Sequence, residues 1–207
     1  FDGTELHEAV ISNLALHRHG FEVEFLAPNI EQAHVFDHLK GENAPGETRN
    51  VLTEAARIAR GHVKELATAK VADYDGVVFP GGFGAAKNLS TYAFDQENCK
   101  VNEDVAQLIR GAYEAKKPMV FMCIAPMVAA RVLERGVELT IGSAPKQCEH
   151  IDKMGAKHVV KKVTEAHVDP EHRVVSTPAY MVEAPINEIA EGIEKAIGEF
   201  VKLVGEK

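Results

Sequence analysis

The sequence of 207 residues has no uninterrupted apolar stretch long enough to cross a bilayer, and its basic residues form no tract. A membrane-spanning helix needs about 20 consecutive apolar residues, so we expect no membrane span. The net charge of -8 is spread along the chain. Binding to a row of phosphates requires clustered Lys and Arg, so nucleic acid is not expected as a partner.

Cysteine is scarce as well. Cys99, Cys123 and Cys148 form no CxxC pair and leave an odd thiol over, which fits a reducing compartment better than a disulfide scaffold.

The sequence has neither the GxGxxG motif nor a GxxxxGKS or GxxxxGKT motif, so phosphate binding is not favoured. A basic and apolar secretory segment is absent from the first residues.

The remaining composition, 45% hydrophobic and 26% charged, is that of a soluble globular protein. A chain of this length can bury one full core, and two ordinary domains would be crowded into it. No internal repeat or linker interrupts the pattern. We therefore expect a single domain over residues 1–207.

Short apolar segments alternate with amphipathic ones, which indicates an α/β fold with a parallel sheet covered on both faces. The clearest helix begins after a candidate cap at Asn102. Its apolar face consists of Val105, Leu108, Ile109, Ala112 and Tyr113, and Pro118 then precedes an apolar strand over residues 119–122. We also expect helices over residues 4–19 and 187–204, strands over 23–26, 76–80, 137–141, 158–160 and 174–176, and a loop over 41–46.

The helix over residues 4–19 begins directly after Phe1-Asp2-Gly3, although a fold of this kind normally starts with a strand. We therefore expect that a first strand is missing from this sequence. The apolar residues that predict the helix are Leu6, Ala9, Val10, Leu14 and Ala15.

Cys123 lies where the apolar strand over residues 119–122 meets the next helix. A residue at such a junction occupies a tight turn at the carboxyl edge of the sheet, and the field of the helix N-terminus favours a thiolate there. This pattern predicts a cysteine nucleophile elbow. The alternative is that Cys123 is a buried small side chain that ends a strand.

A second turn, Pro80-Gly81-Gly82-Phe83-Gly84, also follows a strand. Paired glycines allow the backbone to approach a substrate and direct N–H groups at a developing oxyanion. An ordinary glycine turn would have the same sequence.

Four segments together resemble the ElbB-like branch of the PfpI-like, class I glutamine amidotransferase-like superfamily. They are GTELHEA at residues 3–9, TRNVLTEAAR at 48–57, PGGFGAAKNL at 80–89 and FMCIAP at 121–126. The resemblance covers nearly the whole chain, and some details are closer to the mitochondrial members of the branch. It implies a flavodoxin-like, doubly wound fold.

The resemblance also assigns roles to residues of the elbow and the glycine turn. It implies that Cys123 is the reactive cysteine, that Glu8 is its carboxyl partner with a raised pKa, and that the N–H groups of Gly82 and Ile124 form an oxyanion hole. Taken alone, Glu8 would be interpreted as a solvated charge on a helix. Amidotransferases pair the Cys with a His, but here Ile124 follows Cys123, so glutamine hydrolysis is not expected.

Three further groups of residues have weaker signals. We expect Gly81, Arg49 and Asn50 to contact substrate, with an ion pair of Arg49 or Arg57 on a helix surface as the alternative. His167 and His172 are expected to be structural or exposed, with the approach of one of them to the Cys123 thiol as the alternative.

His34 and His38 have the i, i+4 spacing of a metal-binding pair, but the sequence offers no convincing third ligand, so no metal is expected.

We expect a cofactor-independent glyoxalase, a lyase that converts glyoxal or a similar small dicarbonyl to a hydroxy acid through a Cys123 hemithioacetal. The alternative is a redox-responsive or protein-binding factor in which Cys123 is oxidised. No cofactor is expected, and a homodimer is. The resemblance favours the mitochondrial matrix, with a bacterial cytoplasm as the alternative.

Overall fold

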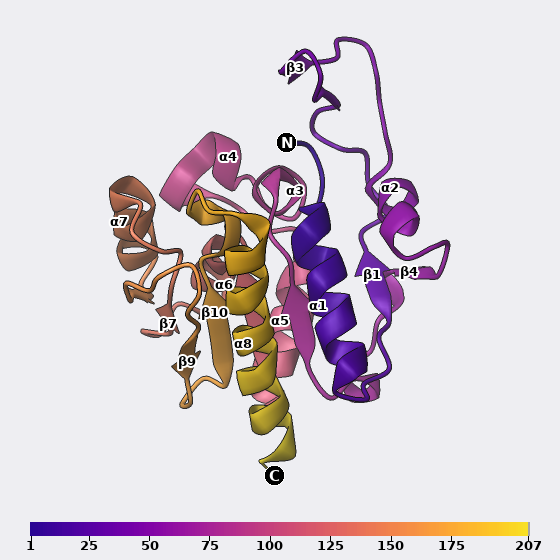
Figure 1. Cartoon of the computed structure of the whole chain (residues 1–207). Coiled ribbons are helices and arrows are strands. Elements are labelled where there is room, and N and C mark those ends of the chain that lie inside the picture. Colours follow the sequence, from indigo (N-terminus) through magenta and orange to yellow (C-terminus); the bar gives the residue numbers. More distant parts are fainter. Residues whose placement is uncertain (207) are drawn as a thin grey trace.

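The computed structural model describes residues 1–206, and a mixed β-sheet with helices on both faces forms its centre (Figure 1). Four strands pair in the order β5-β6-β10-β9: β5 Val77–Phe79, β6 Met119–Met122, β10 Val174–Thr177 and β9 His167–Asp169. β5, β6 and β10 are parallel, while β9 runs antiparallel to β10. The expectation of a purely parallel sheet was therefore wrong at this edge, because only a short turn joins β9 to β10 and a short turn connects antiparallel neighbours.

Strand β6 is an interior strand of the sheet, between β5 and β10, and is buried along its whole length. Val120 pairs with Val78 on one side and with Val175 on the other. An apolar run that is buried on both faces is typical of a strand inside a parallel sheet. This arrangement places the end of β6, and Cys123 directly after it, at the middle of the sheet's carboxyl edge.

Helices cover both faces of this sheet. In Figure 1, α1 (Leu6–Arg18) and α8 (Ile186–Gly205) lie in front of it, and α5 (Glu103–Glu114) and α6 (Pro126–Leu133) lie behind. The cap at Asn102 is confirmed, because its side-chain oxygen accepts hydrogen bonds from the N–H groups of Asp104 and Val105. The shorter helices are α2 Val51–Ile58, α3 Phe83–Lys87, α4 Tyr92–Asp95, α7 Pro145–Lys153, and the 3-10 turns η1 Leu66–Thr68, η2 Val71–Asp73, η3 Gln96–Asn98 and η4 Ala179–Met181.

Helix α1 buries a face on which small residues predominate. Ala9, Ser12 and Ala15 face the interior together with Glu8 and Leu16, and the side chains of Leu6, Val10 and Leu14 are exposed. Small side chains on the inner face let α1 pack closely against α8. The apolar residues that predicted this helix therefore do not form one inward face.

The short strands differ from their expected limits. A parallel pair is formed by β7 Glu138–Leu139 and β8 Lys157–His158. β7 lies within the segment predicted at 137–141, and β8 overlaps the segment predicted at 158–160 by one residue. The segment predicted as a loop at 41–46 contains β3 Glu42–Asn43, which forms a hairpin with β2 Phe36–Asp37. The pairing of β2 with β3 depends on backbone hydrogen bonds across the turn and not on alternating apolar side chains. The hydrophobic periodicity of the sequence therefore did not predict this hairpin.

A second parallel sheet consists of β1 Phe25–Ala27 and β4 Val63–Glu65. Between β1 and β5 lies a cavity of about 1010 Å³, lined by both strands and by residues of α1 that include Asn13. The Asn13 side-chain oxygen is buried and has no hydrogen-bond partner among residues 1–206. The cavity lies where a strand between β1 and β5 would join the two sheets. The first strand that was expected from the sequence stays a prediction. No helix in the described part of the chain is both long and apolar enough to cross a membrane.

Candidate active site

Cys123 occupies a strained turn between β6 and α6. Its φ of 57° lies in the left-handed region, which costs a residue other than glycine about 1 kcal/mol or more. The Cys123 N–H donates to the Thr177 carbonyl oxygen at 3.1 Å, which anchors the turn to the end of β10. This is the strand–turn–helix geometry that the sequence predicted.

Glu8 is the second chemical group of the site, and it is 0% exposed. Its Oε2 accepts a hydrogen bond from the Gly81 N–H at 2.7 Å, and its Oε1 accepts one from the Tyr180 N–H at 3.4 Å. Its carboxyl and the Cys123 side chain lie against the same backbone position, Gly81, and Cys123 affects the pKa of the carboxyl. The interpretation of Glu8 as a solvated charge was wrong, because helix periodicity places this residue on the buried face of α1.

The glycine turn lies against this pair so closely that no side chain fits. A Cβ added at Gly81 would lie 2.5 Å from Cys123 Cβ and 3.0 Å from Glu8 Oε2. Gly82 has a φ of 86°, and a Cβ there would lie 2.4 Å from the Glu5 nitrogen. The N–H groups of Gly82 and Ile124 lie near enough to the Cys123 sulfur to lower the pKa of its thiol. Two backbone N–H groups therefore lie beside the atom that would attack a carbonyl.

Burial controls the electrostatics of the pair. It raises the pKa of Glu8 to about 7, against the lowering effect of the Gly81 N–H. Burial and then the negative charge of Glu8 raise the pKa of the Cys123 thiol, while the Gly82 and Ile124 N–H groups lower it. The expectation of a stabilised thiolate was therefore wrong. Residues 124 and 125 separate Cys123 from the start of α6, so the helix field acts from a greater distance.

The predicted substrate contacts divide into two groups. Gly81 lies in the site, whereas Arg49 makes surface ion pairs with Glu47 and Glu54, both at 3.5 Å. The Asn50 side-chain oxygen caps α2 by accepting from the Thr53 N–H. In the described part of the chain, no hydrogen bond or ion pair connects Arg49 or Asn50 with Cys123 or Glu8. Arg57 pairs with Glu54 at 3.0 Å.

The late histidines have carboxylate partners at the sheet edge. His167 Nε2 lies 3.1 Å from Glu138 Oε2, and His172 Nδ1 lies 2.7 Å from Asp169 Oδ2. Both pairs involve strand β9 or the turn after it, and among residues 1–206 neither ring is hydrogen-bonded to Cys123 or Glu8.

The rings of His34 and His38 have different neighbours: His34 packs edge-on against Phe94, and His38 contacts Phe1 and Phe36. Residues 1–206 contain no group of three or more His, Cys, Asp or Glu side chains placed to hold a metal ion.

Sequence reasoning missed two side chains beside the site, His7 and Tyr180. His7 Nδ1 and the Tyr180 hydroxyl are hydrogen-bonded at 2.7 Å, across 173 residues of sequence. His7 directly precedes Glu8, and Tyr180 lies in η4, shortly after strand β10. Only the fold shows that these two segments meet.

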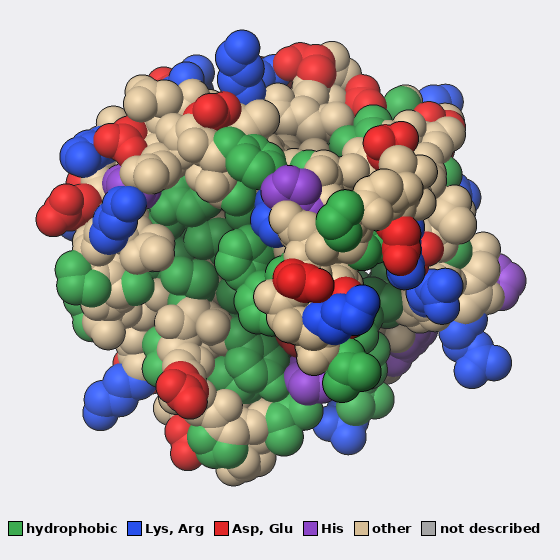
Figure 2. Space-filling view, turned by 90° about the horizontal axis from the view of Figure 1, so that it is seen from above, with side chains coloured by type: hydrophobic (Ala, Val, Ile, Leu, Met, Phe, Trp, Pro, Cys, Tyr) green, Lys and Arg blue, Asp and Glu red, His purple; other side chains and the backbone are tan. Residues whose placement is uncertain are grey.

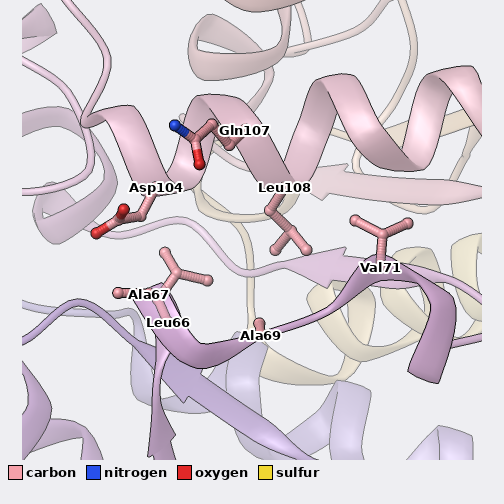
Figure 3. Close-up of a pocket in the computed structure, with 7 residues that line it drawn as sticks. All are labelled: Leu66, Ala67, Ala69, Val71, Asp104, Gln107 and Leu108. Carbon is pink, nitrogen blue, oxygen red and sulfur yellow. The ribbon is translucent and has the colours of Figure 1, made fainter.

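A smaller cavity of about 230 Å³ lies between the η1–η2 segment and α5 (Figure 3). Figure 3 shows Asp104 and Gln107 of α5 on one side and the segment from Leu66 to Val71 on the other. Neither this cavity nor the one between β1 and β5 is lined by Cys123 or Glu8. The buried pair therefore stands apart from both cavities.

The mixed α/β sheet has the fold of the DJ-1 and PfpI-like class of structures. The chain matches a crystal structure of DJ-1beta from Drosophila melanogaster with a TM-score of 0.57 and 20% identity, covering 99% of this chain and 87% of that one. At this identity the match shows the fold alone. No protein-family model matches the chain.

Closer relatives show the family. The chain is 48% identical over 214 residues to the mitochondrial glutamine amidotransferase-like class 1 domain-containing protein 3 of Homo sapiens, covering 99% of this chain and 80% of that protein. It is 34% identical over 199 residues to the mitochondrial ES1 protein of Danio rerio, covering 88% and 73%. An isoprenoid biosynthesis protein with an amidotransferase-like domain from Ehrlichia chaffeensis matches with a TM-score of 0.90 and 38% identity, covering 98% and 93%. The chain belongs to the ElbB-like branch of the class I glutamine amidotransferase-like superfamily.

Proposed function

We propose that the chain is a cofactor-independent glyoxalase that acts on glyoxal or a similar small dicarbonyl. The observation that supports this proposal is the buried Glu8 carboxyl, which lies beside Cys123 at the Gly81 turn and whose pKa is raised to about 7. A general acid–base group is most effective when its pKa is near the working pH. A single carboxyl of this kind can both accept and return a proton in each turnover.

The proposed reaction begins when Cys123 Sγ adds to an aldehyde carbon while Glu8 takes the thiol proton. The N–H groups of Gly82 and Ile124 stabilise the oxyanion that forms. Glu8 returns its proton to this oxygen, and the product is a hemithioacetal. Because Glu8 can accept the thiol proton, the raised pKa of Cys123 does not prevent the attack.

Glu8 then removes the C–H proton of the hemithioacetal carbon and delivers it to the oxygen of the neighbouring carbonyl, which gives an enediol. Glu8 next takes the hydroxyl proton from the sulfur-bearing carbon's oxygen and delivers a proton to the neighbouring carbon. These transfers convert the hemithioacetal to a thioester of glycolate without any external oxidant. Water adds to the thioester carbon, the C–S bond breaks, and glycolate and the free thiol are released. One water is consumed in each turnover.

The test is glycolate formation from glyoxal by the parent chain, Cys123→Ala, Glu8→Gln and Cys148→Ala. Cys148 is half-buried on α7 and serves as the matched thiol control. We expect turnover in the parent and in Cys148→Ala, and a loss of at least about 100-fold in the other two variants. The proposal fails if the parent forms no glycolate, or if Cys123→Ala retains the parent rate.

The alternative of a redox-responsive factor has less support. Selective oxidation requires an exposed thiolate, and Cys123 is only 7% exposed with a raised pKa. Cys148 is the more accessible thiol. These properties favour the enzymatic proposal over a sensor based on Cys123.

We also propose a homodimer in which a second copy covers the outer face of α1. Leu6, Val10 and Leu14 are 60%, 53% and 47% exposed and lie four residues apart, so they form one apolar stripe. A two-fold axis would bring this stripe against its own copy.

Val10→Glu should shift the sedimenting species to a monomer, whereas Val160→Glu, at an exposed valine outside the stripe, should not. A monomeric parent would refute the dimer.

The names of the human and zebrafish relatives place those proteins in mitochondria. We propose the mitochondrial matrix for this chain as well. A bacterial cytoplasm, the other location expected from the sequence, is also compatible with its free thiols.

A further inference from the structure

The Glu8 carboxyl receives one of its two backbone hydrogen bonds from a turn with little intrinsic stability. Tyr180 lies in η4, directly after Ala179, whose φ of 42° is left-handed and unfavourable for a residue with a Cβ. The Tyr180 N–H reaches Glu8 Oε1 at 3.4 Å, which is long compared with the 2.7 Å bond from Gly81. Small movements of η4 would therefore decide whether Oε1 keeps this donor.

One side-chain contact connects η4 with the first turn of α1. The Tyr180 hydroxyl and His7 Nδ1 are hydrogen-bonded at 2.7 Å, and their rings lie 5.7 Å apart. The first turn of α1 is itself fixed, because Glu5 Oε2 accepts a hydrogen bond from the Glu8 N–H at 2.7 Å. His7 Nδ1 also lies 3.8 Å from Glu5 Oε1. The contact thus joins the turn to the part of α1 that carries Glu8.

We propose that His7 is a positioning residue for the Glu8–Cys123 pair: through the Tyr180 hydroxyl it holds η4 in place, so that the Tyr180 N–H stays directed at Glu8 Oε1. The inference rests on the proposed glyoxalase function for its activity readout. The titratable groups that face the Glu8 carboxyl are Glu5 on its own helix, Cys123 on the β6–α6 turn and Tyr180 on η4. A donor to the carboxylate favours the ionised form, so loss of the His7 contact should make Glu8 harder to ionise.

The experiment compares His7→Leu, Tyr180→Phe, the double variant and His7→Asn. Asn places an amide near the position of Nδ1 and should preserve the contact. His17→Leu is the matched control, because His17 is exposed on the same helix and its ring makes no hydrogen bond in the described part of the chain. The titration midpoint of Glu8 is measured by carbon-13 NMR of labelled carboxyls, and kcat and KM for glyoxal are measured against pH.

We expect the Glu8 midpoint to rise in His7→Leu and in Tyr180→Phe, with kcat about threefold to tenfold lower on the acid side of the profile and KM little changed. The double variant should match either single variant, since both remove the same contact. His7→Asn and His17→Leu should resemble the parent.

The inference is overturned if His7→Leu leaves the Glu8 midpoint at the parent value, or if the two single effects add in the double variant. It can fail independently of the proposed function. A parent without glyoxal turnover refutes the glyoxalase, while the NMR midpoints still decide whether His7 positions the carboxyl.

Discussion

Glu8 and Cys123 share one buried space, so the ionisation of each depends on the other. A negative charge on Glu8 raises the pKa of the thiol, and the Cys123 side chain lowers the pKa of the carboxyl. Near neutral pH this pair therefore carries no more than one negative charge. Proton transfer between the two groups can then accompany attack on a substrate without bringing a second charge into the interior.

The first residue-scale prediction concerns stability against pH. Folding raises the Glu8 pKa from 4.5 to about 7, so its stabilising contribution is complete below about pH 4.5 and is lost as the pH rises to about 7. This loss amounts to roughly 3 kcal/mol. Gln does not ionise, so the free energy of unfolding of Glu8→Gln relative to the parent should rise across this interval, as measured by urea denaturation.

Glu114→Gln serves as the control for this measurement, because Glu114 is exposed on α5. The free energy of unfolding of Glu114→Gln should equal that of the parent at every pH. If both variants track the parent equally, Glu8 does not titrate as a buried carboxyl.

A second residue-scale prediction concerns the glycine turn. Gly81→Ala should destabilise the fold by about 1–3 kcal/mol through overpacking, since the new Cβ would lie 2.5 Å from Cys123 Cβ. It should also reduce glyoxal turnover, because either Cys123 or Glu8 must move. Gly198→Ala on α8 is the matched control, with no atom within 4 Å of its Cβ. Equal thermal midpoints for the two variants would contradict this account.

At the scale of elements, α5 is the helix whose start the sequence predicts most directly. Asn102→Ala removes the acceptor for two backbone N–H groups and should cost about 1 kcal/mol. Asn102→Asp retains an acceptor and should cost much less. Chemical denaturation of both variants checks this, and equal losses would show that the side-chain cap is not what stabilises the helix.

Other elements show why limits and faces were harder to predict. β6 and α5 were recognised from apolar runs and a cap, which are local signals. β4 is a three-residue strand with Lys64 and Glu65, and it exists because β1 lies beside it. The inner face of α1 was likewise not predicted, because which of its side chains are buried depends on how α8 packs against it.

At the scale of the whole molecule, the cavity between β1 and β5 divides the sheet. Figure 2 shows the molecule from above: hydrophobic side chains occupy a broad part of this face of the molecule, and many charged side chains lie around the edge of the face. The cavity exposes strand edges and the unpaired Asn13 oxygen. An extended segment placed between β1 and β5 would bury the apolar lining and pair both edges.

The prediction at this scale is that an apolar strand-forming segment fused before Phe1 stabilises the molecule. It should raise the thermal midpoint by at least a few degrees and reduce the binding of an apolar fluorescent dye. A Gly/Ser segment of equal length is the control and should change neither. Equal midpoints for the two fusions would exclude the cavity as a strand site.

The sequence by itself determined the features that depend on neighbouring residues: the alternation of strands and helices, the Asn102 cap, the turn at Cys123 and the glycine pair before α3. The tertiary structure alone decided that Glu8 is buried, that the Cys123 pKa is raised, that Arg49 pairs on the surface and that His7 meets Tyr180. The physical reason is that backbone conformation responds to adjacent side chains, whereas burial and electrostatics sum over groups brought together from distant segments of the chain.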